Sequence, residues 1–286
     1  MPERSGKRDA GEDRRRVVIE GVRPEIDGGR FPIKRVIGEP VVVEADIFAD
    51  GHEALKARLV WRHASQRMWR AAAMEPLGND RWRASFEVEA LGRYVYGLIA
   101  WVDPFDTWQR DLRKRIDAGQ DIDIDLKIGA GIVERISRRA AGTDHETLLS
   151  AVRALRAGDI AGRTRVAFAP RLERLIARYP DVEDATRYGR ELEVVVDPVR
   201  AGFSAWYELF PRSAGSNGRH GTLRDVIARL DYIEELGFDV LYLPPIHPIG
   251  RTRRKGPNNV DTGVLDDVGS PWAIGALEGG HKAVHS

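Results

Sequence analysis

Apolar and polar residues alternate along the first hundred residues with the two-residue period of β-strands. Turn-forming residues such as Asp50-Gly51 and Gly78-Asn79-Asp80 separate the alternating runs. The runs are 17–20, 40–48, 54–63, 81–88 and 92–102. Several short strands with regular turns are typical of an immunoglobulin-like β-sandwich, which we predict for 16–103. A further apolar run at 188–199 is assigned to this sandwich or to a linker.

From 104 to 187 the apolar positions recur at three- and four-residue spacing, as in amphipathic helices. In one of these segments they are Leu148, Leu149, Val152 and Leu155. The predicted helical segments are 106–117, 128–139, 145–156 and 163–179, the last interrupted by Pro170. Short amphipathic helices in series favour a small helical bundle, whose many arginines form its solvated face.

The segment from Phe203 to Gly256 predicts a strand, a helix and a second strand. Phe203–Phe210 is short, aromatic and apolar. Leu223–Leu236 carries an apolar stripe between a capping Thr222 and Gly237, and Phe238–Leu243 is nearly unbroken in its apolar character. An apolar strand after an amphipathic helix indicates a parallel βαβ unit, as in an α/β barrel or a doubly wound sheet.

Composition narrows the protein class. A hydrophobic content of 42% supports packed cores. With 45 basic against 44 acidic residues, the chain has no strong positive electrostatic field that would attract nucleic acid or an acidic membrane. The absence of cysteine excludes disulfides, thiolate metal sites and a cysteine nucleophile, and fits a cytoplasmic protein. We expect residues 1–15 to be a charged, disordered tail rather than a secretory signal, and no apolar run is long enough to span a membrane.

Four tryptophans of the alternating region have two interpretations. Exposed aromatic rings stack on sugars, whereas alternating aromatic residues in a sandwich are more often core, and we favour core. These residues are Trp61, Trp69, Trp82 and Trp101.

Sequence motifs in the last third of the chain resemble those of a known family. Gly221–Asp225 with Leu236–Ile246 resembles the first barrel repeat of the α-amylase superfamily, glycoside hydrolase family 13. The narrower motifs are His247-Pro248-Ile249-Gly250, Arg254-Lys255-Gly256, Asn258-Asn259, Gly269–Gly275 and Glu278–His281. Together they are similar to bacterial maltosyltransferases that extend α-1,4-glucans from maltose 1-phosphate. The resemblance covers the whole chain in order, although 260–268 matches loosely.

The resemblance implies an N-terminal sandwich with a helical segment, a homodimer, and a (β/α)8 barrel that begins at residue 200. A barrel takes about 250 residues, so 200–286 is expected to hold only its first βαβ unit. Retaining transfer uses an Asp nucleophile and a Glu acid, which the family carries on later strands. We therefore assign no catalytic residue, cofactor or metal here, and expect the fragment alone to be inactive. The family places the lysine equivalent to Lys255 at the donor sugar.

The proposed site residues and the proposed function each have an alternative interpretation. Lys255 could belong to a solvated basic turn with Arg251, Arg253 and Arg254. His247 is interpreted as a loop-packing residue. No feature of the sequence assigns a catalytic role to Asp261, Asp266 or Asp267. The rival functions are a non-catalytic module that binds glucan or dimerises, and another glycosidase of the α-amylase superfamily.

Overall fold

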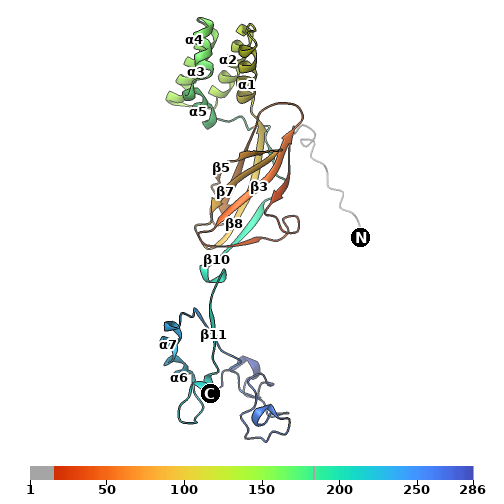
Figure 1. The fold of residues 1–286 in the computed structure, drawn as a ribbon, viewed down its shortest axis with the longest axis vertical. Helices are drawn as coiled ribbons and strands as arrows, with labels where there is room; N and C mark the ends of the chain where they lie inside the picture. Colours follow the sequence, from red (N-terminus) through yellow and green to blue (C-terminus); the bar gives the residue numbers. More distant parts are fainter. Residues whose placement is uncertain (1–15, 183, 286) are drawn as a thin grey trace, which may run out of the picture. The chain divides into compact units, whose positions relative to one another are not determined.

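The computed structural model describes residues 16–182 and 184–285, which divide into two compact units (Figure 1). The first, here called the sheet-and-helix unit, ends at Asp197, and the second, the C-terminal unit, begins at Pro198. The predicted tail, 1–15, lies outside the described residues.

Two sheets form the β part of the sheet-and-helix unit, with strand orders β1–β3–β7–β6 and β2–β10–β8–β4–β5. The short strand β9 pairs with β8 beside the second sheet. The strands are β1 (Val17–Arg23), β2 (Ile33–Val36), β3 (Pro40–Ala49), β4 (Leu55–His63), β5 (Arg70–Ala73), β6 (Glu75–Gly78), β7 (Arg81–Glu87), β8 (Gly92–Val102), β9 (Thr186–Arg187) and β10 (Leu192–Asp197).

Strand β10 lies between β2 and β8 in the second sheet. It pairs antiparallel with β8, where Leu192 is opposite Tyr96, and parallel with β2, where Val194 is opposite Ile33. The strand predicted near 191–197 is therefore part of the sheet and not a linker. Strand β10, about 100 residues after its pairing partners in β8, thus completes a sheet that the N-terminal strands begin.

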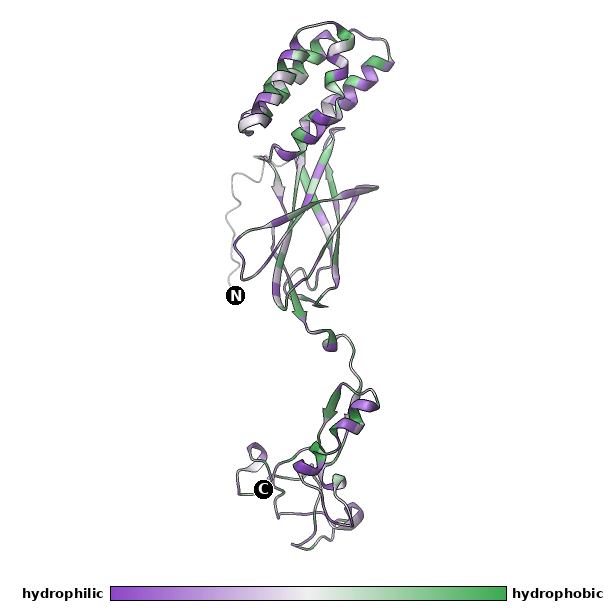
Figure 2. Ribbon diagram, turned by 90° about the vertical axis from the view of Figure 1, so that its left-hand side faces the viewer, coloured by the Kyte–Doolittle hydropathy of each residue, from purple (hydrophilic) through white to green (hydrophobic). Residues whose placement is uncertain are grey.

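The two sheets share one hydrophobic core made from the predicted alternating positions. Val43 and Ile47 of the first sheet and Leu59 and Leu98 of the second are almost fully buried. Figure 2 shows apolar and polar residues alternating along these strands. In β3 the alternation places every second side chain in this core, whereas the middle of β8 is buried on both faces.

The tryptophan prediction is confirmed in part. Trp82 and Trp101 are buried, and Trp82 donates its indole N–H to the Ile47 carbonyl at 3.1 Å. Trp61 is half-buried and stacks on Phe86. Trp69 is wrong as a core residue: it is 41% exposed, and the Arg62 guanidinium lies 5.0 Å from its ring centre. It lies just before β5, the last strand of its sheet, so no further strand flanks it on that side.

The predicted helices form, with boundaries shifted by a few residues. Pro170 separates the last two, as expected from its missing N–H. The helices are α1 (Pro104–Asp117), α2 (Asp123–Ser137), α3 (Gly142–Arg156), α4 (Ile160–Ala167) and α5 (Pro170–Arg178). They share a second core whose fully buried members include Phe105, Leu126, Leu148 and Leu155.

Helix α1 begins directly after β8. The Asp103 carboxylate accepts the N–H groups of Phe105 and Asp106, each at 2.9 Å, and so caps the helix. Further along α1, the Trp108 indole packs on Gly129 of α2 and donates to the Asp125 carbonyl at 2.7 Å. A Cβ on Gly129 would lie 2.0 Å from the Trp108 ring, so glycine is what lets these two helices approach.

The C-terminal unit has two short parallel strands, β11 (Trp206–Glu208) and β12 (Val240–Tyr242). The helix predicted as continuous over 223–236 is in fact α6 (Leu223–Ile227) and α7 (Leu230–Glu235). At Arg229 ψ is −5°, and its N–H bonds the carbonyl of Val226 three residues back, which tightens the turn and divides the helix. Short 3-10 helices lie at Val199–Ala201, Pro211–Ala214, Pro257–Asn259 and Gly280–Lys282.

Candidate functional site

The carboxyl ends of β11 and β12 define one edge of the C-terminal unit. Because the strands are parallel, with Tyr207 opposite Leu241, the chain leaves both of them at the same edge. A small core of buried Leu209, Ala214, Val226 and Ile233 holds the strands against α6 and α7. Loops 209–222 and 243–260 therefore start side by side.

Asparagine and glycine shape the loop that carries Lys255. Asn258 and Asn259 have left-handed φ values of 54° and 64°, which asparagine tolerates better than most residues. The Gly256 N–H donates to the Val260 carbonyl at 2.9 Å. A Cβ on Gly263 would lie 2.3 Å from the Arg254 carbonyl oxygen, so the loop closes tightly on itself. This closure fixes the backbone on both sides of Lys255.

Lys255 forms an ion pair with Asp261 in the same loop. Its side chain is 36% exposed, against 84% for Asp261. The hydrogen bond from Lys255 holds the pKa of Asp261 below its usual range. An exposed pair of this kind is worth little to stability, so a ligand anion could replace Asp261 at small cost.

Lys255 also lines a cavity of about 630 Å³. Arg212 and His220, from the loop that follows β11, line the same cavity. Sequence reasoning missed both residues, although their position after an apolar strand places them at the same sheet edge as the Lys255 loop. The remaining lining comes from Phe210, 256–259 and 267–272, including Trp272. The arrangement gathers basic and imidazole groups around an opening large enough for a small ligand.

Two arginines tie the loop 267–272 in place. Arg212 donates to the Gly269 carbonyl at 2.9 Å, and Arg254 donates to the Val268 carbonyl at 3.3 Å. Arg254 and Arg212 also line a neighbouring cavity of about 460 Å³. Of the basic turn 251–255, only Arg254 and Lys255 therefore line these cavities, and Arg251 and Arg253 are exposed.

The remaining sequence candidates pack within the loops. His247 is buried, its Nε2 lies 3.0 Å from the Ala273 carbonyl oxygen, and its ring meets that of His281, which agrees with a loop-packing role. Asp267 accepts the Val264 N–H at 2.6 Å. Within 16–182 and 184–285, no group of three or more His, Asp or Glu side chains could hold a metal ion, and no helix is long and apolar enough to cross a membrane.

Comparison with known proteins gives the family. Residues 15–198 match the family model described as alpha-1,4-glucan:maltose-1-phosphate maltosyltransferase, domain N/S. A Chlorobaculum tepidum protein of the same name is 50% identical over 273 residues, covering 95% of this chain and 41% of the relative. A Myxococcus xanthus protein of that name is 49% identical over 278 residues, covering 94% and 42%.

The chain belongs to the family of α-1,4-glucan:maltose-1-phosphate maltosyltransferases, which are glycosyltransferases. It matches the N-terminal part of these relatives and spans about two fifths of their length. A Rhodospirillum rubrum relative, 45% identical over 285 residues, shows the same coverage, with 94% of this chain and 41% of its own length.

Proposed function

We propose that this chain supplies the N-terminal region and the start of the catalytic domain of a retaining maltosyltransferase. Its donor is α-maltose 1-phosphate and its acceptor an α-1,4-glucan. In this proposal the two-sheet region is an immunoglobulin-like sandwich, and 200–286 is the first βαβ unit of a (β/α)8 barrel. Supporting this, β11 and β12 are parallel with α6 and α7 between them in sequence. We also propose a cytoplasmic homodimer.

Lys255 is the residue proposed to contact the donor. The observation that supports this role is its position on a cavity at the carboxyl edge of two parallel strands, which Arg212 and His220 also line. Barrel enzymes build their sites at that edge. An ammonium group can donate three hydrogen bonds to sugar hydroxyls or to phosphate oxygens. Asp261 would then be the internal partner that the donor displaces.

The chemistry of retaining transfer limits what this chain does by itself. It needs a nucleophilic carboxylate and an acid roughly 5–5.5 Å apart. We assign both to the part of the relatives that this chain does not match. A purified polypeptide of these 286 residues is therefore expected to release no phosphate from maltose 1-phosphate with a glucan acceptor. Turnover above a no-protein control would contradict that assignment.

The donor role is tested in a chimera that joins residues 1–286 to the remaining part of the Chlorobaculum tepidum relative. Lys255→Ala should lower kcat/KM for maltose 1-phosphate by about tenfold or more, since a hydrogen bond to a charged group is worth roughly 1.5–3 kcal/mol. Phosphate release at varied donor concentration measures this.

Arg251→Ala is the matched control, because Arg251 is an exposed cation of the same loop that lines neither cavity. It should leave kcat/KM within about twofold, as a change at a solvated surface charge does. Equal kinetics for the two variants would return Lys255 to the solvated basic turn.

A further inference from the structure

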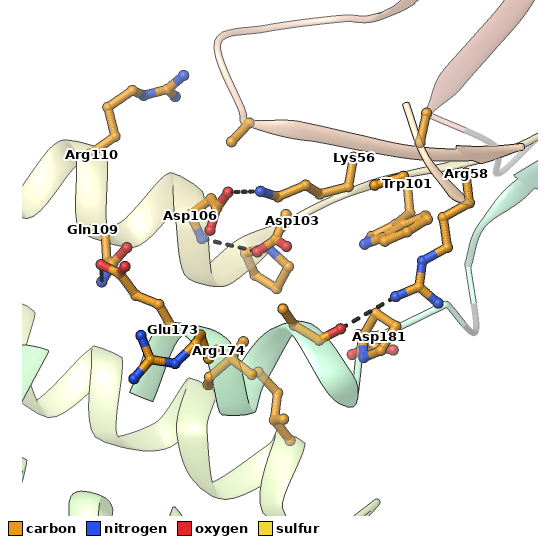
Figure 3. A pocket seen from close by; sticks show the side chains of 18 of the residues that line it. Lys56, Arg58, Trp101, Asp103, Asp106, Gln109, Arg110, Glu173, Arg174 and Asp181 are labelled. Atoms are coloured by element: carbon orange, nitrogen blue, oxygen red, sulfur yellow. Dashed lines mark hydrogen bonds and ion pairs between the residues drawn. The ribbon is translucent and has the colours of Figure 1, made fainter. Parts of the chain in front are cut away.

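A cleft of about 840 Å³ lies within the sheet-and-helix unit, where the second sheet meets helices α1 and α5 (Figure 3). Strand β4 and the end of β8 line one side, and the two helices line the other. The volume falls within the range of roughly 300–1,000 Å³ that holds small ligands. Its apolar lining comes from Met74, Trp101, Ile136, Phe168 and Ile176.

Polar bridges across the cleft join its two walls. Lys56 of β4 forms an ion pair with Asp106 of α1 (Figure 3). Arg58 of β4 donates to the Ala177 carbonyl in the last turn of α5 at 3.3 Å, and its guanidinium lies 5.6 Å from the Trp101 ring centre. These contacts join β4 to α1 and to α5 beside the cleft.

The acidic groups of the cleft are already engaged by the protein. Asp103 accepts two backbone N–H groups at the start of α1, and Asp106 pairs with Lys56. Glu173 accepts from the Gln109 amide at 3.1 Å, and Asp181 pairs with Arg139 at 2.5 Å. Asp106 and Asp181 are thus paired with cations, whereas Asp103 and Glu173 accept hydrogen bonds from neutral N–H groups.

Two of the cleft's cations have no such partner. Arg113 of α1 lies over the Phe168 ring at 4.9 Å, and Arg174 lies on α5. Among the residues that the structure describes, neither guanidinium has a carboxylate within ion-pair distance. Both side chains are exposed and both line the cleft. The lining has five basic side chains (Lys56, Arg58, Arg110, Arg113, Arg174) against four acidic ones (Asp103, Asp106, Glu173, Asp181), so its balance is positive beside an apolar surface.

We propose that this cleft binds an organic phosphate, whose phosphate group contacts Arg113 and Arg174 and whose body rests on the apolar lining beside Trp101 and Phe168. The planar guanidinium fork presents paired N–H donors that match phosphate oxygens. An inorganic anion would leave the apolar lining wet, so an ester with a sugar- or nucleoside-sized body fits better. The proposal is independent of maltosyl transfer, because it concerns binding within the sheet-and-helix unit.

Calorimetric titration of the 286-residue chain in 0.15 M salt tests the proposal. The probes are glucose 1-phosphate, AMP, inorganic phosphate and uncharged glucose. One of the two esters should bind one-to-one, at least tenfold more tightly than inorganic phosphate or glucose, and the tighter ester identifies the body. No binding of either ester at millimolar concentration overturns the proposal. So does an inorganic phosphate affinity equal to that of the esters.

Variants locate the site. Arg113→Gln with Arg174→Gln should weaken ester binding at least tenfold, because two charge-assisted contacts are lost. The matched control is Arg171→Gln, which removes an exposed cation of α5 that does not line the cleft, and it should change the affinity less than twofold. Equal weakening by the double variant and the control would mean non-specific charge attraction.

A second variant does not alter charge. Ala73 is exposed and lines the cleft from β5, so Ala73→Phe should fill the space and weaken ester binding at least tenfold while thermal unfolding stays cooperative. Unchanged binding in Ala73→Phe overturns the assignment to this cleft. Loss of maltosyl transfer in the chimera would leave these titrations unaffected, so failure of the proposed function and failure of this proposal are distinguishable.

Discussion

The two units of this chain bury their apolar residues to very different extents. Among the residues that the structure describes, twenty buried apolar residues form the core between the two sheets and sixteen form the core of the helices, whereas four form the core of the C-terminal unit. In the C-terminal unit Phe203 is 82% exposed and Ile227 64%. Burial of apolar area is the main favourable term in folding, at roughly 25 cal/mol per Å².

The difference shows that a segment can form its secondary structure without burying its apolar side chains in a core. Helices α6 and α7 form where their periodicity predicts, yet only Val226 and Ile233 of the stripe are buried, and Leu223, Leu230 and Leu236 are 40% to 50% exposed. Helices α2 and α3 carry stripes of the same kind and bury them against each other. The first unit therefore has the means to fold by itself and the second depends on further contacts.

The largest expected effect concerns the units in isolation. A polypeptide of residues 16–197 should unfold cooperatively in urea, because its cores are complete. A polypeptide of residues 198–286 should show no cooperative transition. Limited proteolysis of the whole chain should leave a resistant piece that ends near Asp197. Uniform digestion of the chain, or a cooperative transition in 198–286, would remove the contrast between the units.

A core truncation gives the next largest effect. Leu98 is 2% exposed, so Leu98→Ala in the polypeptide 16–197 should lower the free energy of unfolding by about 2–5 kcal/mol. The matched change in the C-terminal unit is Leu236→Ala, where the side chain is 50% exposed, and it should alter the stability of the whole chain by roughly 0.5 kcal/mol or less. Urea midpoints measure both; a Leu98→Ala loss below 1 kcal/mol would show a core looser than its burial indicates.

Two glycines of α2 compare a packed and an open position within one helix. Gly129→Ala would place its Cβ 2.0 Å from the Trp108 ring, so it should destabilise the helices by about 1–3 kcal/mol. Nothing lies within 4 Å of the corresponding Cβ at Gly131, and Gly131→Ala should stabilise by up to about 1 kcal/mol through helix propensity. Thermal unfolding of the two variants should shift in opposite directions. A shift of the same sign in both would contradict the Trp108–Gly129 packing.

The smallest effect is electrostatic and depends on pH. Hydrogen bonds from Lys127 and then Arg163 hold the pKa of Asp123 below its usual range, and Arg163 is buried while it pairs with Asp123 at 2.6 Å. A folded-state pKa below the unfolded value of about 3.9 adds stability that is fully present above that value and is lost as the pH falls through the folded one. Asp123→Asn keeps an acceptor oxygen but removes the charge.

The Asn variant should therefore be less stable than the natural chain at pH 7, and the gap should close as the pH falls below about 4. Urea unfolding of 16–197 at pH 7, 5 and 3.5 measures the gap. A gap of constant size across this range would mean that the charge of Asp123 contributes nothing.

Much of the sheet-and-helix unit could be predicted from local pattern. The alternation of Trp82, Phe86 and Val88 predicts the inward face of β7 and of the residue that follows it. Pro170 marks the break between α4 and α5. Of the candidate site, the motif around Lys255 identified one residue. Arg212 and His220 were missed because they precede the helix by sequence and join Lys255 only when the two strands pair in parallel.

The sequence by itself indicated the longer strands and the helices of the sheet-and-helix unit, since propensity and periodicity act over a few neighbouring residues, but not the short strands β2, β5, β6 and β9. It also carried the family resemblance, which resides in short contiguous motifs. Only the tertiary structure decided that β10 inserts between β2 and β8, that the stripe 223–236 divides at Arg229, and that Arg113 and Arg174 share a cleft with Trp101. Such pairings depend on contacts between distant segments, which no local periodicity encodes.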